Sequence, residues 1–170
     1  FRGLSKMNTF VNLTSIDARL DFGEPGILVS DDSYMSKIIT EKPNNLKQFT
    51  NLGYQSYYVS QEELDLMQKL FFDAYRLGEI TADIHESEPI LRDTDILSVD
   101  IKAIKANELD YISGNPNGFD GAQICNLMRY AGLSDRLSVI GLFDVPPSFR
   151  SDQLIAQMVW YVFEGYCYRR

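Results

Sequence analysis

The apolar residues of this 170-residue chain switch repeatedly between the spacing of a β-strand and the spacing of an α-helix. Strand-like stretches cover residues 9–17, 49–58, 96–100 and 137–144, and helix-like stretches cover residues 33–39, 60–76, 89–92, 121–131 and 151 onwards. This alternation is typical of an α/β protein with a mainly parallel sheet. We therefore predict one domain over residues 1–170, folded as a three-layer α/β/α sandwich.

Local signals indicate where several helices begin and end. Residues 60–63, Ser-Gln-Glu-Glu, have the spacing of a capping box, in which Ser60 and Glu63 satisfy each other's backbone N–H groups at a helix start. Apolar residues at helical spacing extend this helix to about Arg76, and Gly78 is expected to end it. The helix over 121–131 is expected to close at Gly132. Aromatic residues surround the apolar stripe of the last helix, so it is expected to be deeply packed or to form an interface.

The composition excludes several classes of protein. The net charge of -8 and the absence of a Lys/Arg block argue against nucleic-acid and anionic-membrane partners. No apolar run in the sequence approaches the roughly 20 residues that span a bilayer. Cys125 and Cys167 lie far apart and neither belongs to a Cys-x-x-Cys pair, so we expect a reduced, cytoplasmic protein. The sequence also lacks the glycine-rich loops of nucleotide-binding domains.

Three predicted strands end in an aspartate: Asp17, Asp100 and Asp144. Ligands of open parallel sheets bind at the carboxyl ends of the strands, so these side chains are expected to converge on one crevice. Asp21 adds a fourth carboxylate nearby. The alternative interpretation is that each aspartate is an ordinary turn or helix-cap residue, because Asp is common in those positions.

Three segments resemble the metal and substrate motifs of the arginase, agmatinase and formimidoylglutamase (ureohydrolase) family. Residues 17–21, Asp-Ala-Arg-Leu-Asp, resemble the family's Asp-Ala-His-x-Asp motif, and residues 98–102, Ser-Val-Asp-Ile-Lys, resemble its Ser-x-Asp-x-Asp motif. Residues 141–147, Gly-Leu-Phe-Asp-Val-Pro-Pro, resemble its late strand ending Glu-x-Asn-Pro. The chain is thus similar to the bacterial, formimidoylglutamase-like branch of that family, which implies an arginase-like α/β fold.

The resemblance implies a site at which two Mn²⁺ ions lower the pKa of a bridging water, so that hydroxide attacks an amidine carbon. The carboxylate ligands of that site correspond to Asp17, Asp21 and Asp100. Arg19 stands where the family has His, and Lys102 stands where it has a second Asp. A cationic side chain has no lone pair to donate to a metal, so the resemblance implies a degenerate metal site.

Asp144 stands in place of the Glu that holds the substrate's guanidinium group in the family. We expect Arg19 and Lys102 to replace the metals by pairing with the remaining carboxylates, with no metal bound. The chain would then be a non-catalytic scaffold or binding protein. The alternative is an active hydrolase of formimidoylglutamate, arginine or agmatine type, with Mn²⁺ held by the three aspartates of the two metal motifs.

The resemblance covers only the later part of the family's domain, so the chain is expected to be a partial domain without the upstream strands. One of those strands carries a Gly-Gly-x-His metal motif in the family, whereas the one histidine here, His85, lies outside any such motif and is expected at the surface. The strand over 9–17 is then expected to be an open edge of the sheet, because its upstream neighbours are missing. The expected partner is the chain's own N-terminal half or another protomer.

Overall fold

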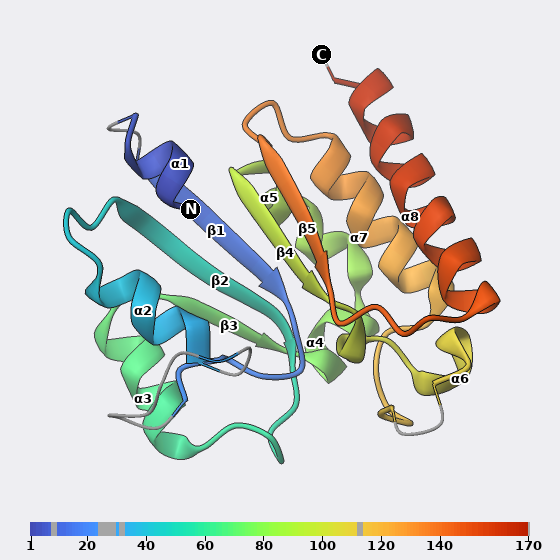
Figure 1. Ribbon diagram of the computed structural model, residues 1–170, viewed down its shortest axis with the longest axis horizontal. Coiled ribbons are helices and arrows are strands. Elements are labelled where there is room, and N and C mark those ends of the chain that lie inside the picture. The colour runs from blue at the N-terminus through green and yellow to red at the C-terminus, as the bar shows by residue number, and fades with distance from the viewer. Residues whose placement is uncertain (8–9, 24–29, 31–32, 112–113, 170) are drawn as a thin grey trace.

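The computed structural model describes residues 1–7, 10–23, 30, 33–111 and 114–169, and in this part five parallel strands form one sheet (Figure 1). The strands are β1 (Val11–Ile16), β2 (Leu46–Tyr54), β3 (Asp73–Arg76), β4 (Ile96–Asp100) and β5 (Val139–Phe143), in the order β3-β2-β1-β4-β5. The helices are α1 (Arg2–Ser5), α2 (Tyr34–Thr40), α3 (Gln61–Lys69), α4 (Leu77–Ala82), α5 (Ser87–Arg92), α6 (Ala106–Leu109), α7 (Gly121–Gly132) and α8 (Phe149–Cys167).

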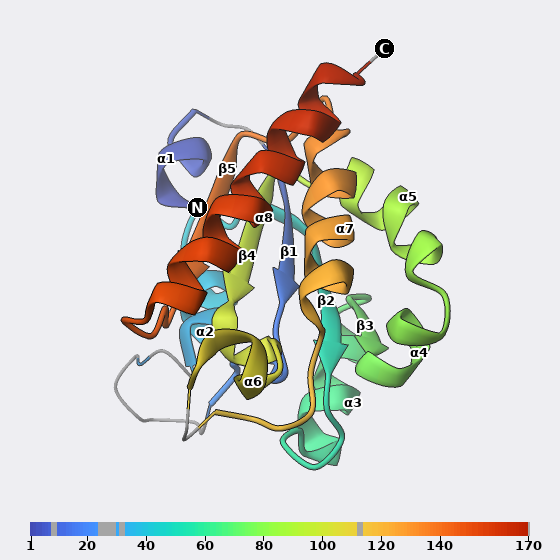
Figure 2. The same ribbon diagram turned by 90° about the vertical axis from the view of Figure 1, so that its right-hand side faces the viewer.

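Helices cover both faces of the sheet, which confirms the predicted three-layer sandwich (Figure 2). On one face, Met128 of α7 and Met158 of α8 join a buried cluster with Leu97 of β4. On the other face, Met35 of α2 and Met67 of α3 pack against β1 and β2. None of the described helices is both long and apolar enough to cross a membrane.

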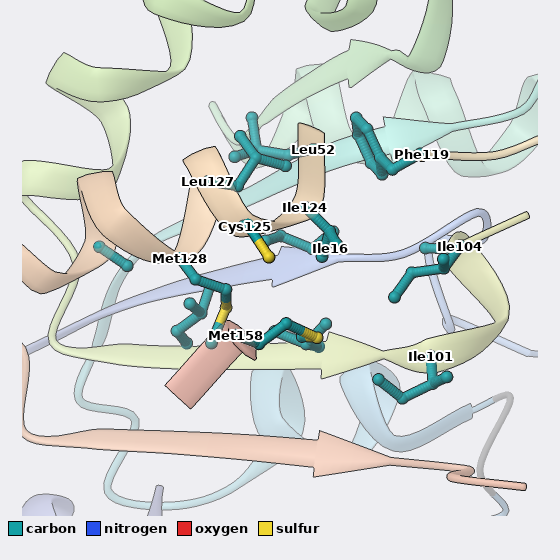
Figure 3. Close-up of a cluster of buried hydrophobic side chains, with 14 of the residues drawn as sticks. Ile16, Leu52, Ile101, Ile104, Phe119, Ile124, Cys125, Leu127, Met128 and Met158 are labelled. Carbon is teal, nitrogen blue, oxygen red and sulfur yellow. The ribbon is translucent and has the colours of Figure 1, made fainter. Parts of the chain in front are cut away.

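The cluster beneath α7 and α8 is drawn in Figure 3 and has more buried residues than the cluster on the other face. The backbones of helices α7 and α8 come close together at two glycines, Gly132 and Gly165. A Cβ atom on Gly132 would overlap the carbonyl oxygen of Val162, and one on Gly165 would overlap the carbonyl oxygen of Arg129. The two helices therefore pack backbone against backbone at this point, without room for a methyl group.

The prediction that the first strand is an open edge is wrong. Strand β1 lies in the middle of the sheet, hydrogen-bonded to β2 on one side and to β4 on the other, and all six of its residues are buried. The order of strands along the chain does not fix their order in a parallel sheet, because each crossover can place the next strand on either side. The edges of the described sheet are β3 and β5.

The long helix predicted over 60–76 is wrong in its second half. The capping box of Ser60 and Glu63 is present, but α3 ends at Lys69. Phe71 then adopts a left-handed backbone with φ of 58°, and the chain enters β3, paired with β2. A four-residue strand is too short to show a two-residue alternation, so its apolar residues were indistinguishable from a helical stripe. Gly78, the predicted stop, lies inside α4.

The other predicted elements are present, most of them with shifted ends. Helices were correctly predicted at α2, α5 and α7, which closes at Gly132. Strand β4 has the predicted bounds, β5 lies inside the predicted 137–144, and α8 begins at Phe149 rather than at 151. Strand β2 begins three residues before 49 and ends at Tyr54, because Tyr58 turns back to donate its N–H to the carbonyl of Gln55. Position 9 of the first predicted strand lies outside the described residues.

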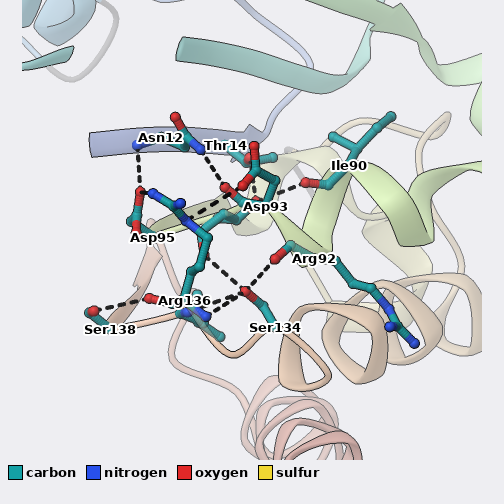
Figure 4. Close-up of polar contacts among 11 residues, drawn as sticks. Asn12, Thr14, Ile90, Arg92, Asp93, Asp95, Ser134, Arg136 and Ser138 are labelled. Carbon is teal, nitrogen blue, oxygen red and sulfur yellow. Dashed lines mark hydrogen bonds and ion pairs between the residues drawn. The ribbon is translucent and has the colours of Figure 1, made fainter. Parts of the chain in front are cut away.

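A buried carboxylate at the start of β4 ties three parts of the fold together (Figure 4). The Oδ2 atom of Asp95 accepts hydrogen bonds from the backbone N–H of Asn12 at 2.7 Å and from the Arg136 guanidinium at 2.9 Å. The backbone carbonyl of Asp95 also accepts from the N–H groups of Ser138 and Val139. Asp95 therefore fixes the starts of β1 and β5 on either side of β4.

Replacing Asp95 with alanine is expected to destabilise the protein by about 2 kcal/mol, because the Asn12 N–H loses its acceptor in a buried place. The control is Asp93→Ala, which removes a carboxylate that is 67% exposed and 3.5 Å from the same guanidinium. That change is expected to cost less than about 1 kcal/mol. Urea unfolding measures the stability of both variants. Equal losses of stability would show that the buried hydrogen bond contributes no more than the exposed ion pair.

Candidate functional site

A cavity of about 300 Å³ lies at the carboxyl edge of the sheet and is lined mainly by oxygen-bearing side chains. Asp17 follows β1, Asp100 ends β4 and Asp144 follows β5. Because the strands are parallel, all three reach the same edge, as predicted. The lining residues, which we call the carboxylate pocket, are Asp17, Asp21, Tyr34, Ser98, Asp100, Phe143 and Asp144.

Two of these aspartates also turn the chain at the end of their strands. The Oδ1 atom of Asp17 accepts the backbone N–H of Arg19 at 2.9 Å, and the Oδ1 atom of Asp100 accepts the backbone N–H of Lys102 at 2.7 Å. Both are local side-chain-to-backbone bonds of the kind that Asp forms in turns. The turn interpretation is therefore correct for Asp17 and Asp100, and it does not exclude their convergence with Asp144.

Asp21 and Asp144 occupy left-handed backbone, with φ of 54° and 56°. Aspartate tolerates this region better than most residues with a side chain, since its short polar group bonds locally. The carbonyl of Asp21 accepts the N–H of Met35 at 3.1 Å, which fastens the loop after β1 to the first turn of α2. This contact places Tyr34, the first residue of α2, at the pocket.

The pocket is electrostatically unfavourable for a second negative charge. Burial, followed by the neighbouring carboxylates Asp21 and Asp100, raises the pKa of Asp17 from 3.8 to about 9, and a hydrogen bond to Asp21 adds to this effect. Asp17 and Asp21 therefore share a proton near neutral pH, as close pairs of carboxyl groups do.

Tyr34 is a pocket residue that the sequence did not indicate. Its hydroxyl hydrogen-bonds the side chain of Ser98, and its pKa is raised by burial and by the charges of Asp21 and Asp17, so it stays protonated. One indication of its position was present in the sequence, because the helix predicted over 33–39 places Tyr34 near its start. Nothing in the sequence showed that this helix begins at the carboxylates.

The prediction that the Arg19 side chain enters the crevice is wrong. Arg19 is exposed, and its guanidinium carbon lies 4.5 Å from the centroid of the Tyr58 ring, in a cation–π contact. The prediction assumed that side chains alternate between the two faces beyond the strand. Strand β1 ends at Ile16, however, and the turn at Asp17 redirects the following residues.

Lys102 pairs with Asp144, the pocket residue at the substrate position. Its Nζ atom is 2.7 Å from Oδ2 of Asp144, and both side chains are partly exposed. The sequence predicted that Lys102 pairs with a carboxylate of the degenerate metal site. The expected partners were Asp17, Asp21 and Asp100, and Asp144 was not among them.

The side chains present do not fit a two-manganese centre. Asp17, Asp21 and Asp100 offer carboxylate oxygens, but within the described part of the chain no three His, Cys, Asp or Glu side chains are placed to hold a metal ion together. Lys102 brings an ammonium group to the pocket in place of an oxygen donor. His85 is exposed, as predicted, and its Nδ1 atom lies 2.7 Å from the hydroxyl of Tyr130, on α7.

A second cavity, of about 420 Å³, lies beside the ends of β2 and β3. Its lining includes Arg76 and Lys105 together with neutral polar side chains, and Asp and Glu are absent from its lining among the described residues. Lys105 therefore lies away from the carboxylate pocket and offers a control for charge changes there.

The raised pKa of Asp17 predicts that stability falls as the pH rises. Between 3.8 and about 9 the folded protein holds a proton on Asp17 that the unfolded chain has lost, so the free energy of unfolding decreases by up to about 1.4 kcal/mol per pH unit. Asp17→Asn is expected to remove this slope and to be more stable than the wild type at pH 8. Urea unfolding at pH 5 and pH 8 measures the difference, with exposed Asp135→Asn as control. An unchanged slope in Asp17→Asn would contradict the assignment.

Comparisons with known proteins find similar structures but no similar sequence. No family model matches the sequence, and no curated protein matches it. Among solved structures, a Trypanosoma cruzi formiminoglutamase with Mn²⁺ superposes with a TM-score of 0.85 at 15% identity, over 98% of this chain and 60% of that one. The formimidoylglutamase from Bacillus subtilis superposes with a TM-score of 0.83 at 16% identity, over 99% and 57%.

An arginase from Entamoeba histolytica, solved in complex with L-ornithine, superposes with a TM-score of 0.75 at 17% identity, over 92% of this chain and 61% of that one. The chain thus spans about three-fifths of the length of these structures while matching nearly all of itself. The resemblance read from the motifs is confirmed at the level of the fold. This chain has the α/β fold of the formiminoglutamases and arginases, as a partial domain.

Proposed function

We propose that this chain is a non-catalytic protein of the arginase fold, which acts as a scaffold or binding subunit in the cytoplasm. The observation that carries the proposal is the 2.7 Å ion pair between Lys102 and Asp144. By the resemblance, Asp144 would have to receive the cationic group of an amidine substrate. An ammonium group of the protein already neutralises that carboxylate, so a cationic substrate gains less from binding there.

The metal motifs support the same conclusion. Arg19 has replaced a ligand with a side chain that lies over Tyr58, and Lys102 has replaced another with a cation. Both substitutions lower the expected affinity of the pocket for Mn²⁺.

An active hydrolase is the second candidate, and one observation favours it. Asp17, Asp21 and Asp100 still line one pocket, and their mutual repulsion would be relieved by a divalent cation. The two candidates differ in metal content and turnover. The test is elemental analysis of the native protein, together with assays for urea or formamide release from arginine, agmatine and formimidoylglutamate with added Mn²⁺. One or two Mn²⁺ per chain with turnover would overturn the proposal.

Restoring the family's ligands is expected to create metal affinity. The double change Arg19→His and Lys102→Asp removes two positive charges, adds one negative charge and restores two ligand types, so Mn²⁺ should bind at least about tenfold more tightly than to the wild type. Calorimetry of the native-length protein measures this. The control is Lys105→Asp, which repeats the charge change of Lys102→Asp at the second cavity. No gain in the double variant, or an equal gain in the control, would count against a degenerate metal site.

A further inference from the structure

A polar patch lies on one face of the sheet, near the amino ends of β1, β2 and β3. In the register of the sheet, Thr14 of β1 pairs with Thr50 of β2, and Thr50 pairs with Asp73 of β3. One row nearer the amino ends, Asn12 pairs with Gln48. Residues that are paired across parallel strands, or lie two apart on one strand, point to the same face. The polar patch therefore shares its face with the apolar cluster beneath α7.

A cavity of about 280 Å³, which we call the amino-edge cavity, lies over this patch. The five residues of the patch line it on one side, and Pro89 and Ile90 of α5 line it on another, together with Asp93, which follows that helix. It shares no lining residue with the carboxylate pocket, which lies at the other ends of the strands. Its volume is just below the range of about 300–1,000 Å³ that is common for small-molecule sites, so it suits a small ligand.

One buried polar atom beside this cavity has no partner. The Nδ2 atom of Asn12 donates to the backbone carbonyl of Asp93 at 2.7 Å (Figure 4). The Oδ1 atom, on the other side of the same amide group, has no hydrogen-bond partner among the described residues, although Asn12 is only 4% exposed. Buried polar atoms in native proteins are nearly always bonded. Because Asn12 lines the amino-edge cavity, this oxygen indicates a ligand that brings a hydrogen-bond donor.

The charges around the cavity favour a cation. Asp73 and Asp93 line it, whereas Lys, Arg and His are absent from its lining within the described part of the chain. The carboxylate of Asp73 accepts a hydrogen bond at 2.8 Å from Gln48, which is a neutral donor. Arg136 lies 3.5 Å from Asp93, but its guanidinium also donates to Asp95 at 2.9 Å. The two lining carboxylates therefore carry more negative charge than the nearby guanidinium neutralises.

We propose that the amino-edge cavity binds the protonated amino group of a small alkylamine. The ammonium N–H groups donate to the Asn12 oxygen and to the Thr50 hydroxyl, and Asp73 and Asp93 balance the charge. The Ile90 side chain provides an apolar wall for a short hydrocarbon chain. Such a ligand supplies both the donor and the positive charge that the lining lacks.

A metal ion fits the same cavity less well. Within the described residues, no three His, Cys, Asp or Glu side chains are placed to hold a metal together. An amide oxygen and hydroxyl groups make up the buried part of the lining, and these are neutral acceptors that suit N–H donors. The proposal involves neither the carboxylate pocket nor turnover, so it does not depend on the proposed function.

Titration of the native protein with n-propylammonium, followed by NMR, tests the proposal. The amide signals of Asn12, Thr14 and Thr50 are expected to shift and to saturate at millimolar concentrations. Tetramethylammonium has the same charge but no N–H group, so it should bind there at least about tenfold more weakly.

Two variants locate the binding. Asp73→Asn keeps the size of the side chain and removes its charge, and it should weaken n-propylammonium binding at least about fivefold. Thr50→Val removes one acceptor at nearly constant volume and should weaken binding about threefold or more. The control is Asp152→Asn, which removes an exposed carboxylate at the start of α8 and should leave the affinity unchanged.

Three results would overturn the proposal. Shifts that do not saturate would show that the cavity holds only solvent. Equal affinities for the two ammonium ions, or an affinity that neither Asp73→Asn nor Thr50→Val lowers, would show that the cation is attracted by the overall charge and not recognised. Displacement of n-propylammonium by an equal concentration of Ca²⁺ would assign the cavity to a metal ion.

Discussion

Replacing Gly132 with valine is expected to destabilise the protein by at least about 3 kcal/mol, a large share of the stability of a typical domain. The reason is the backbone contact between α7 and α8, where a Cβ on Gly132 would overlap the carbonyl oxygen of Val162. Carbonyl groups in a helix cannot rotate away, so the two helices must separate and open the cluster around Met128 and Met158.

Urea unfolding followed by circular dichroism measures the loss. Gly78→Ala is the matched control, because Gly78 also lies in a helix but a Cβ there meets nothing within 4 Å. That change is expected to be neutral or to stabilise by up to about 1 kcal/mol. An unfolding midpoint of Gly132→Val that equals the wild type would show that α7 and α8 are not in backbone contact.

Replacing Phe49 with alanine is expected to cost about 3–5 kcal/mol, since its ring is fully buried in the core on the α2 and α3 side. The ring makes edge-to-face contacts with Phe22 and Phe72, with centroids 6.3 and 5.9 Å away. Both neighbours would face a cavity in the variant.

The control for Phe49→Ala is Phe71→Ala, because the Phe71 side chain is 87% exposed. Its change in the free energy of unfolding is expected to stay within about 0.5 kcal/mol. Thermal and urea unfolding both report the difference. Similar losses in the two variants would mean that the cluster on this face is loosely packed.

Much of the fold could be predicted from short sequence patterns, because these elements are determined by interactions between residues close together in the sequence. The capping box at Ser60 and the strand over Ile96–Asp100 depend on neighbours within a few residues, and both were predicted with their bounds. The convergence of Asp17, Asp100 and Asp144 followed from the parallel direction of the strands alone, and did not require the strand order.

The remaining features depend on contacts between distant segments. The β3 strand exists because β2 offers it an edge, whereas its own four residues resemble the end of a helix. Arg19 turns toward Tyr58, and Tyr34 reaches Ser98, through loops whose paths no periodicity encodes. The strand order also depends on distant contacts, which is why an edge was predicted at β1, whereas the edges of the described sheet are β3 and β5.

The central position of β1 has a consequence for biosynthesis. Leu13 pairs with Ile96, so the strand made near the start of this sequence gains its second neighbour only after roughly 80 further residues have been made. Until β4 emerges from the ribosome, one side of an entirely buried strand stays without a partner. Long-range pairing of this kind slows folding. Nascent chains that stall before residue 96 are therefore expected to be the forms that most need a chaperone.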